Sequence, residues 1–263
     1  MQAMLDKIIS ILIPASQEEL LKRFKRVSYE FKADGTLVTE ADLAMQERMH
    51  KELAGFWPEY DFLGEEMTSE QQQAVLTDSD KGIWCLDPLD GTSNYAMGIP
   101  HFAPSLAFIE RGQVKLGVVY DPLREECFSA IRGRGAWLNG EPLSLRDRAY
   151  PAQPAIAIID FKRLPTSLAA SLASNPPYKS QRSFGSVALD WCWMAAGRSH
   201  VYLHGRQNIW DFAAGQLVFE EAGGYSSTLE GEPVFSYQLE PRSAVAALNK
   251  PLFDNWRKCL QQQ

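Results

Sequence analysis

The four cysteines of this 263-residue sequence never occur as a C-x-x-C pair. Cys85, Cys127, Cys192 and Cys259 each stand alone, which excludes a zinc knuckle and a thioredoxin-type redox motif. Cysteines without a pairing pattern favour reduced thiols. We therefore expect a cytoplasmic protein that does not depend on disulfides.

Long apolar runs are also missing, and the net charge has the wrong sign for a polyanionic partner. The run Ile8–Ile13 ends at Pro14, well short of the ~20 apolar residues of a membrane-spanning helix. The first residues lack the basic start and cleavage site of a signal peptide. The net charge of −7, from 26 basic and 33 acidic residues, disfavours binding to nucleic acid or to an anionic membrane. We expect neither partner.

The composition is that of a folded globular protein, with 45% hydrophobic and 22% charged residues. A chain of this length can bury a substantial core. In its first half, helical periodicity predicts a helix over residues 40–56, with Thr39 at its start. Apolar runs at 105–110, 114–121 and 127–131 predict an antiparallel meander.

The second half alternates between the two kinds of element. The predicted strands and helices follow one another at 155–160, 167–174, 186–196, 200–204 and 211–222. Pro151 and Pro154 lie in a loosely patterned stretch before them. We therefore predict an α+β half over residues 1–150 and an α/β half over residues 151–263.

The chemistry is concentrated in residues 83–95, which read Ile-Trp-Cys-Leu-Asp-Pro-Leu-Asp-Gly-Thr-Ser-Asn-Tyr. An apolar, strand-like run meets a turn that carries Asp87, Asp90 and Thr92. Two carboxylates this close repel each other, so a cation, a basic partner or a shifted pKa must stabilise them. Mg²⁺ prefers oxygen ligands, which Asp87, Asp90 and the Leu89 carbonyl would supply. Free N–H groups of a helix beginning at Thr92 would hold a phosphate.

Other acids lie near turns and helix starts, and each has an ordinary structural explanation. Glu65 follows a short predicted strand, where a solvated surface charge is the simpler interpretation. Asp211 begins a predicted helix, where an N-cap and a metal ligand are both open. Thr39 and Asp42 form a pair like a capping box, and capping alone would explain both.

Several motifs occur in the order typical of one enzyme family. They read Leu-Val-Thr-Glu-Ala-Asp (37–42), Gly-Glu-Glu (64–66), Asp-Pro-Leu-Asp-Gly-Thr-Ser-Asn-Tyr (87–95), Gly-Val-Val-Tyr-Asp-Pro (117–122), Gly-Arg-Gly-Ala (133–136), Trp-Asp (210–211) and Glu-Ala-Gly-Gly (221–224). Together they resemble the inositol monophosphatase family, the lithium-sensitive, Mg²⁺-dependent phosphomonoesterases. The resemblance covers most of the chain. It implies an α/β (α+β) fold, the layered αβαβα sandwich of the inositol monophosphatase and fructose-1,6-bisphosphatase type.

The resemblance also implies two to three Mg²⁺ ions in each active site. By analogy with the family, Glu65, Asp87 and the Leu89 carbonyl bind one ion. Asp87, Asp90 and Asp211 bind a second, and a third, loosely held ion depends on Glu65. In this chemistry the metals activate water for in-line attack on the phosphate, without a covalent enzyme intermediate.

Roles for neighbouring residues follow from the same resemblance. The backbone N–H groups of Gly91 and Thr92 are expected to contact the phosphate. The Thr92 side chain pairs with Asp42 to help activate the attacking water, which gives Asp42 a role that its place in a helix would not suggest. The family also implies a homodimer that acts on a small phosphate monoester.

The substrate side departs from the family pattern. Where inositol phosphatases carry a glutamate that bonds an inositol hydroxyl, this chain has His204. Imidazole is a different donor and acceptor, so strict inositol specificity is not implied. A packing role at a strand edge would equally explain this histidine. Gly185, Ser186 and Val187 fall where the substrate-facing helix of the family begins, so we expect them near the leaving group.

The predicted function is therefore Mg²⁺-dependent hydrolysis of a small polyol or sugar phosphate. Inositol 1-phosphate is the first candidate, because Ser93-Asn94-Tyr95 is similar to the Thr-Asn-Phe of the inositol group. Arg206 would bind a second anionic group of the substrate. Histidinol phosphate, fructose 1,6-bisphosphate and 3′-phosphoadenosine 5′-phosphate are alternative substrates. A non-catalytic metal-binding regulatory protein is the alternative of another class, although it would not need the full acidic set.

Overall fold

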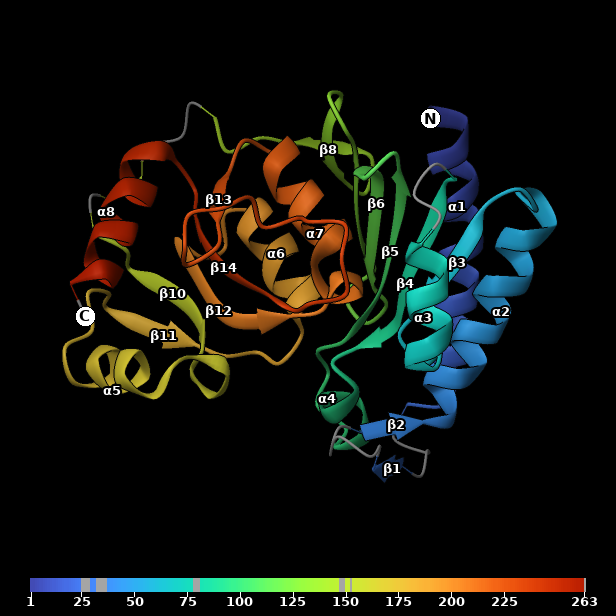
Figure 1. The fold of residues 1–263 in the computed structure, drawn as a ribbon, viewed down its shortest axis with the longest axis horizontal. Coiled ribbons are helices and arrows are strands. Elements are labelled where there is room, and N and C mark those ends of the chain that lie inside the picture. The colour runs from blue at the N-terminus through green and yellow to red at the C-terminus, as the bar shows by residue number, and fades with distance from the viewer. Residues whose placement is uncertain (25–28, 32–36, 78–80, 147–149, 152, 263) are drawn as a thin grey trace.

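The computed structural model describes residues 1–24, 29–31, 37–77, 81–146, 150–151 and 153–262. The elements form five layers in the order helix, sheet, helix, sheet, helix (Figure 1). Its helices are α1 (Gln2–Ala15), the π-helical turn Ser16–Leu21, α2 (Glu40–Phe56), α3 (Ser69–Leu76), α4 (Thr92–Ala96), the 3₁₀ turn Phe161–Arg163, α5 (Thr166–Ser174), α6 (Val187–Ala195), α7 (Ile209–Glu221) and α8 (Lys250–Gln261). The αβαβα sandwich is thus the observed architecture.

The sheet nearer the N-terminus has seven strands within the described residues, in the order β3-β4-β5-β6-β7-β8-β9. These are β3 (Asp61–Gly64), β4 (Ile83–Asp90), β5 (Ala103–Glu110), β6 (Gln113–Asp121), β7 (Glu126–Ile131), β8 (Gly135–Leu138) and β9 (Glu141–Leu143). The β3 and β4 strands run parallel, and every later neighbour is antiparallel. The predicted meander is therefore confirmed as β5, β6 and β7.

The second sheet has five described strands, in the order β11-β10-β12-β14-β13. Its strands are β10 (Ile156–Asp160), β11 (Ser180–Arg182), β12 (Val201–Gln207), β13 (Tyr225–Ser227) and β14 (Arg242–Ala247). β10 runs parallel to both of its neighbours, so β10 and β12 end at the same edge of the sheet. A small separate pair, β1 (Tyr29–Phe31) and β2 (Leu37–Thr39), is antiparallel.

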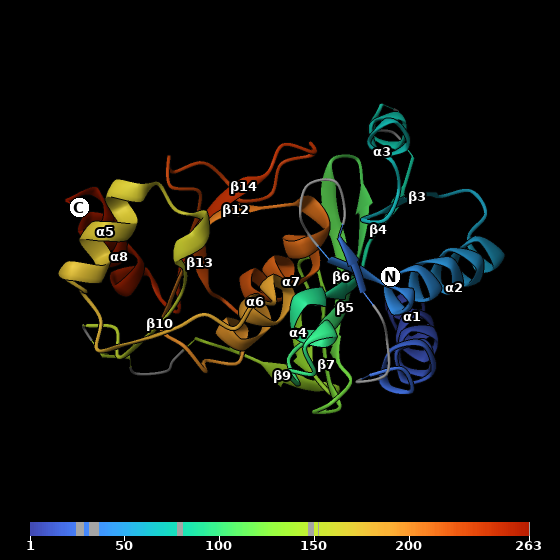
Figure 2. The same cartoon turned by 90° about the horizontal axis from the view of Figure 1, so that it is seen from below.

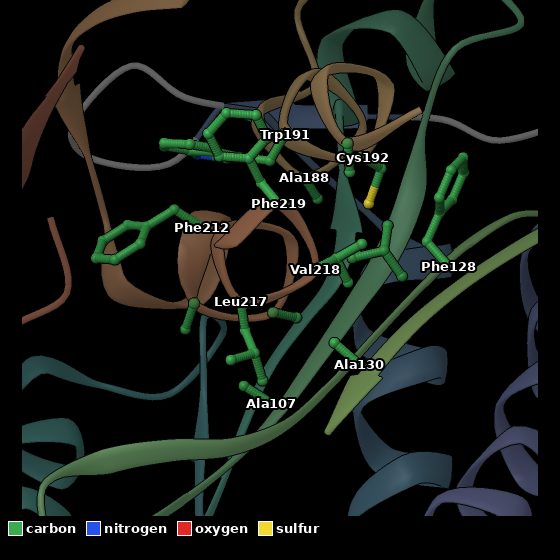
Figure 3. Packing of buried hydrophobic residues seen from close by; sticks show 14 of the residues in the cluster. Ala107, Phe128, Ala130, Ala188, Trp191, Cys192, Phe212, Leu217, Val218 and Phe219 are labelled. Atoms are coloured by element: carbon green, nitrogen blue, oxygen red, sulfur yellow. The ribbon is translucent and has the colours of Figure 1, made fainter. Parts of the chain in front are cut away.

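The middle layer, α6 and α7, packs between the two sheets, as the turned view also shows (Figure 2). Trp191 and Phe219 are fully buried there and contact each other (Figure 3). The two helices approach closely at Gly215, which has no side chain. A Cβ added there would lie only 2.8 Å from the Cβ of Trp191. A Cβ on Gly117 of β6 would similarly lie 2.7 Å from the carbonyl oxygen of Ala214. Glycine at these two positions lets α7 lie directly on the sheet and on α6.

Most predicted elements are confirmed, with shifts at their ends. The helix predicted over 40–56 has those bounds. The strand predicted over 200–204 extends to Gln207, and the helix predicted from Asp211 begins at Ile209. The predicted boundary between halves includes residues 147–149 and 152, which lie outside the described residues, so the division at 150 remains a prediction. Among the helices that the structure describes, none is both long and apolar enough to cross a membrane.

Candidate active site

A cavity of about 330 Å³ opens where strand ends of both sheets meet the N-terminal ends of α6 and α7. Twelve of the residues singled out in the sequence line it. They are Glu65, Asp87, Leu89, Asp90, Gly91, Thr92, Gly185, Ser186, Val187, His204, Arg206 and Asp211. The remaining one, Asp42, lies behind the wall and reaches the cavity through Thr92. The fold therefore gathers residues from separate parts of the chain into one place.

The two central carboxylates project from a bulge in β4, not from a turn after it. The strand continues to Asp90, with Asp87 opposite Ser105 and Asp90 opposite Ala103, and the register shifts between them. Pro88 has no N–H for the ladder, and the N–H of Leu89 donates to Asp87 Oδ1 at 2.9 Å. The predicted turn is therefore wrong. A bulge re-aims side chains in this way without ending the strand.

Asp90 and Asp211 are each fixed through one carboxylate oxygen. Asp90 Oδ2 accepts hydrogen bonds from the Ser186 hydroxyl at 2.5 Å and the Ala188 N–H at 2.7 Å. Asp211 Oδ2 accepts from the Asn208 N–H at 2.8 Å. Asn208 is the N-cap of α7 and Asp211 is the N3 residue of its capping box, so a capping role of Asp211 is confirmed, one turn inside the predicted position. The Val187 N–H also stabilises the Asp90 carboxylate, and both carboxylates line the cavity.

The electrostatics of these acids favour a cation in the cavity. Burial, with a smaller contribution from the Glu65 charge, raises the pKa of Asp90 to about 7 even though hydrogen bonds from Ser186 and Ala188 oppose the rise. Burial and the charges of Glu65 and Asp90 also raise the pKa values of Asp87 and Asp211 well above the usual range. Every candidate metal ligand among these residues binds through oxygen, as a hard divalent cation requires. No group of three or more metal-binding side chains is closely preassembled among the described residues. The donor set thus fits Mg²⁺ by chemistry and charge.

Glu65 stands at the end of β3, beside β4. Its N–H donates to the Leu86 carbonyl at 3.1 Å, which extends the parallel pairing of β3 and β4 to this residue. The half-buried residue lines the same cavity as Asp87. The alternative of a purely solvated surface charge is therefore wrong.

Thr92 and Asp42 connect the cavity wall to the start of α2. Asp42 Oδ2 accepts from the Thr39 N–H at 2.8 Å and the Thr39 hydroxyl at 2.6 Å, so the capping interpretation is confirmed. Its other oxygen, Oδ1, lies 3.0 Å from the Thr92 hydroxyl. That hydroxyl also lies 2.9 Å from the Leu89 carbonyl oxygen. It has one proton to donate, and its lone pairs can accept a hydrogen bond from a molecule in the cavity.

Gly91 makes the turn between β4 and α4 possible. Its φ of +93° lies in the left-handed region, where residues with a Cβ are strained. A Cβ here would also lie 3.0 Å from the His101 carbonyl oxygen. The residue therefore brings the Thr92 backbone to the cavity wall. The helix that follows is a single short turn of five residues, Thr92–Ala96.

His204 lies on β12, the central strand of its sheet, so the strand-edge interpretation is wrong. The side chain is buried and lines the cavity. Its Nδ1 accepts from the Arg206 N–H at 3.2 Å, which leaves Nε2 to donate to Asp160 Oδ2 at 3.2 Å. These two partners hold the ring in one orientation.

Several cavity residues were missed in the sequence. They are Asp160, Lys162, Arg163, Ser183, Asp190 and Asn208. A signal was present for the first three, because Asp160 ends an apolar strand just as Asp90 does. Carboxyl ends of neighbouring parallel strands meet at one edge of a sheet, where ligands commonly bind. The register confirms this, since Asp160 lies opposite His204.

The comparison with known families agrees with this geometry. The sequence model of the inositol monophosphatase family matches residues 3–261. The chain belongs to the inositol monophosphatase family. The predicted resemblance is thus confirmed over nearly the whole chain.

Relatives within the inositol monophosphatase family cover most of the sequence. The protein named Nus factor SuhB from Pasteurella multocida is 32% identical over 237 residues, which are 88% of this chain and 86% of that protein. The inositol-1-monophosphatase of Bacillus subtilis is 32% identical over 228 residues, 84% of this chain and 83% of that one. A solved IMPase structure from Thermotoga maritima has a TM-score of 0.84 at 29% identity, over 99% of this chain and 97% of that chain. Family membership supports a phosphatase, in a family that is generally metal-dependent.

Proposed function

We propose that this chain is a Mg²⁺-dependent phosphomonoesterase that hydrolyses a small polyol or sugar phosphate. The observation that carries the proposal is the meeting of four acids with the Thr92–Asp42 pair at one cavity. The name of the Bacillus subtilis relative makes inositol 1-phosphate the first candidate substrate. The homodimer and the cytoplasmic location expected from the sequence remain predictions.

Two to three Mg²⁺ ions would be held by Glu65, Asp87, the Leu89 carbonyl, Asp90 and Asp211. When bound, the ions would lower the pKa of a coordinated water and neutralise charge on the phosphate. The chain contributes preorganised ligands. The Leu89 N–H orients Asp87, and the Ser186 hydroxyl orients Asp90. Ligands fixed in this way lose little freedom on binding, which favours both affinity and rate.

Thr92 and Asp42 would position the attacking water. The pKa of Asp42 is raised to about 6 by burial, with a further contribution from the Glu65 charge, so the group is a carboxylate at neutral pH. That carboxylate accepts a hydrogen bond from the Thr92 hydroxyl, which turns a lone pair of the Thr92 oxygen toward the cavity. The water then donates to Thr92, and its own lone pair points at phosphorus. Backbone N–H groups of Gly91 and Thr92 would contact the phosphate oxygens.

The leaving group would occupy the part of the cavity wall that adjoins Asp90. Gly185, Ser186 and Val187 line it at the start of α6, and His204 lies beside them. The Nε2–H of His204 already donates to Asp160 and is not free to bind the substrate. The group of this pair that can accept a hydrogen bond from the leaving group is therefore the Asp160 carboxylate. A hydroxylated leaving group suits this wall, because a hydroxyl can donate to that carboxylate.

Phosphate release from a substrate panel tests the proposed function. The panel contains inositol 1-phosphate, histidinol phosphate, fructose 1,6-bisphosphate and 3′-phosphoadenosine 5′-phosphate, each with Mg²⁺ and with EDTA. We expect turnover only with Mg²⁺, and kcat/KM ranks the substrates. Some relatives are named Nus factor SuhB, so a regulatory protein without turnover is the competing function. Absence of turnover with every ester would favour that alternative.

We expect Mg²⁺ to stabilise the protein more as the pH rises from about 5 to 7.5, because protons and metal compete for the same carboxylates. Asp42 and Asp90 have pKa values raised to about 6 and about 7, above their unfolded values. Between the unfolded and the folded pKa of each group, the folded chain binds more protons than the unfolded chain. These groups therefore lower the stability of the fold as the pH rises. Bound metal removes that cost. The melting temperature should rise by roughly 5–10 °C at pH 7.5 with Mg²⁺ at 100 times Kd, and much less at pH 5.

The measurement is the difference between the melting temperatures with and without Mg²⁺, taken at each pH and at equal ionic strength. This design matters because His101 acts in the opposite direction. Burial lowers its pKa to about 4, so its contribution to stability grows with pH. That contribution is the same with and without metal and cancels. An increment equal at both pH values would contradict metal binding by these carboxylates.

A further inference from the structure

Three cationic side chains line the cavity and have no hydrogen-bond or ion-pair partner among the residues that the structure describes. Lys162, Arg163 and Arg206 are exposed and line the cavity wall. None of them forms a side-chain hydrogen bond or ion pair with the residues that the structure describes. Arg198, by contrast, pairs with Glu126, and Arg242 bonds Glu232 at 2.8 Å. The rim cations are therefore available to a ligand.

Backbone contact brings two of these cations together. A Cβ on Gly205 would lie 1.8 Å from the Arg163 carbonyl oxygen, so the segment after β10 lies directly on β12. The register of β12 with β14 also shifts between His204 and Gln207, which places this glycine and Arg206 in an irregular stretch. Arg163 and Arg206 thus project from two segments that touch. A side chain at position 205 would force them apart.

The two arginines also separate the main cavity from a neighbouring one. Arg163 and Arg206 line both, and the second cavity has a volume of about 410 Å³. Both arginines line the cavity that also holds Asp87, Asp90 and Asp211. A small molecule whose phosphate lies at the carboxylates would therefore face the pair.

The floor between the carboxylates and the rim is polar. Asp190 is 5% exposed, lines the cavity and has a buried Oδ1 without a hydrogen-bond partner. A buried polar atom without a partner is costly, and this one belongs to a residue of the cavity lining. The Asp160–His204 pair lies on the same floor. A hydroxylated molecule suits these groups better than an apolar one.

We propose that Arg163 and Arg206, assisted by Lys162, bind a second anionic group of the substrate. The preferred substrates would then be hydroxylated phosphate esters that carry another phosphate or a carboxylate. Guanidinium groups bind both anions through paired N–H donors, which gives them strength and direction. This inference rests on the proposed function, since it takes the carboxylate side as the place of the phosphate that is cleaved.

A matched pair of substrates tests the proposal. Fructose 1,6-bisphosphate and fructose 1-phosphate share a sugar and differ by one phosphate. We expect the wild-type kcat/KM to be at least about tenfold higher for the bisphosphate, since hydrogen bonds to charged groups contribute about 1.5–3 kcal/mol. The double variant Arg163→Gln, Arg206→Gln should lose that advantage, mainly through KM. Its kcat/KM for fructose 1-phosphate should fall by much less than its kcat/KM for the bisphosphate, because only the bisphosphate has a second anion for the arginines to bind.

Arg134→Gln is the control variant. Arg134 is exposed at the turn after β7 and does not line the cavity, so its removal changes the net charge alone. The kcat/KM of this variant for each of the two fructose phosphates should match that of the wild type at equal ionic strength. All three arginines are exposed, so the variants are expected to fold, which circular dichroism checks.

Two results would overturn the proposal. One is a wild-type enzyme that hydrolyses fructose 1-phosphate as efficiently as the bisphosphate. The other is an equal loss on both substrates in the double variant, which would place the arginines at the reacting phosphate. If no ester is hydrolysed, the proposed function fails first. Calorimetric binding of the two fructose phosphates then still decides, because equal affinities exclude a second anion site.

Discussion

Asp90→Asn is expected to lower kcat by about 10³-fold or more, because metal-based charge stabilisation contributes several kcal/mol to the transition state. The amide oxygen of asparagine can still accept the bonds from Ser186 and Ala188, so the bulge of β4 should be retained. What changes is the atom that faces the cavity, where a neutral NH₂ replaces an anionic oxygen. Phosphate release under saturating substrate measures the effect.

The stability of this variant separates a metal role from a structural one. Without Mg²⁺, its melting temperature should equal or exceed that of the wild type, because one of several repelling charges is removed. With Mg²⁺, it should gain less than the wild type. Asp254→Asn, at an exposed position of α8, is the control and should behave as wild type in both measurements. Near-normal turnover of Asp90→Asn would show that the metal assignment is wrong.

Thr92→Val is expected to reduce kcat by roughly 10²–10⁴-fold, the usual contribution of a group that activates and orients the attacking water. Valine keeps the shape of threonine but has no hydroxyl to bridge Asp42 and the water. KM should change little, since the backbone of residue 92 stays in place. Single-turnover phosphate release separates the chemical step from binding.

Thr92→Ser provides the matched control for that prediction. Serine keeps the hydroxyl, so most of the rate should return even though a methyl group is lost. A structural role alone would predict the opposite order, with the valine variant closer to wild type because it fills the same volume. Equal rates for the valine and serine variants would contradict the proposed role of the hydroxyl.

Local patterns predicted the elements of this fold well. The helix over 40–56 and the meander of β5, β6 and β7 are set by periodicity and capping, which act between residues close in the chain. The course of the chain at Asp87–Asp90 was predicted less well. A proline and two acids favour a turn locally, but pairing with β5 on both sides of the bulge continues the strand. Pairing with a distant strand overrode the local preference.

The candidate site shows the same division. Asp87 and Asp90 were found because two acids crowd one short stretch, whereas Glu65 and Asp211 were assigned only through the family resemblance, since each also had an ordinary structural explanation. Asp160 was missed, although it ends an apolar strand as Asp90 does, because nothing local shows that its strand lies parallel to the one that carries His204. That arrangement depends on strand order, which is a property of the whole sheet.

The sequence by itself determined the family, the order of the layers through that family, and the acids of the candidate metal site. Only the tertiary structure decided how those acids are held and what lies opposite them. The Ser186 hydroxyl reaches Asp90 across 96 positions of sequence, and Arg163 meets Gly205 through backbone contact. Such contacts depend on register and on the close approach of backbones, which no local pattern encodes. The reaction can therefore be inferred from short motifs, whereas the substrate side depends on how distant segments pack.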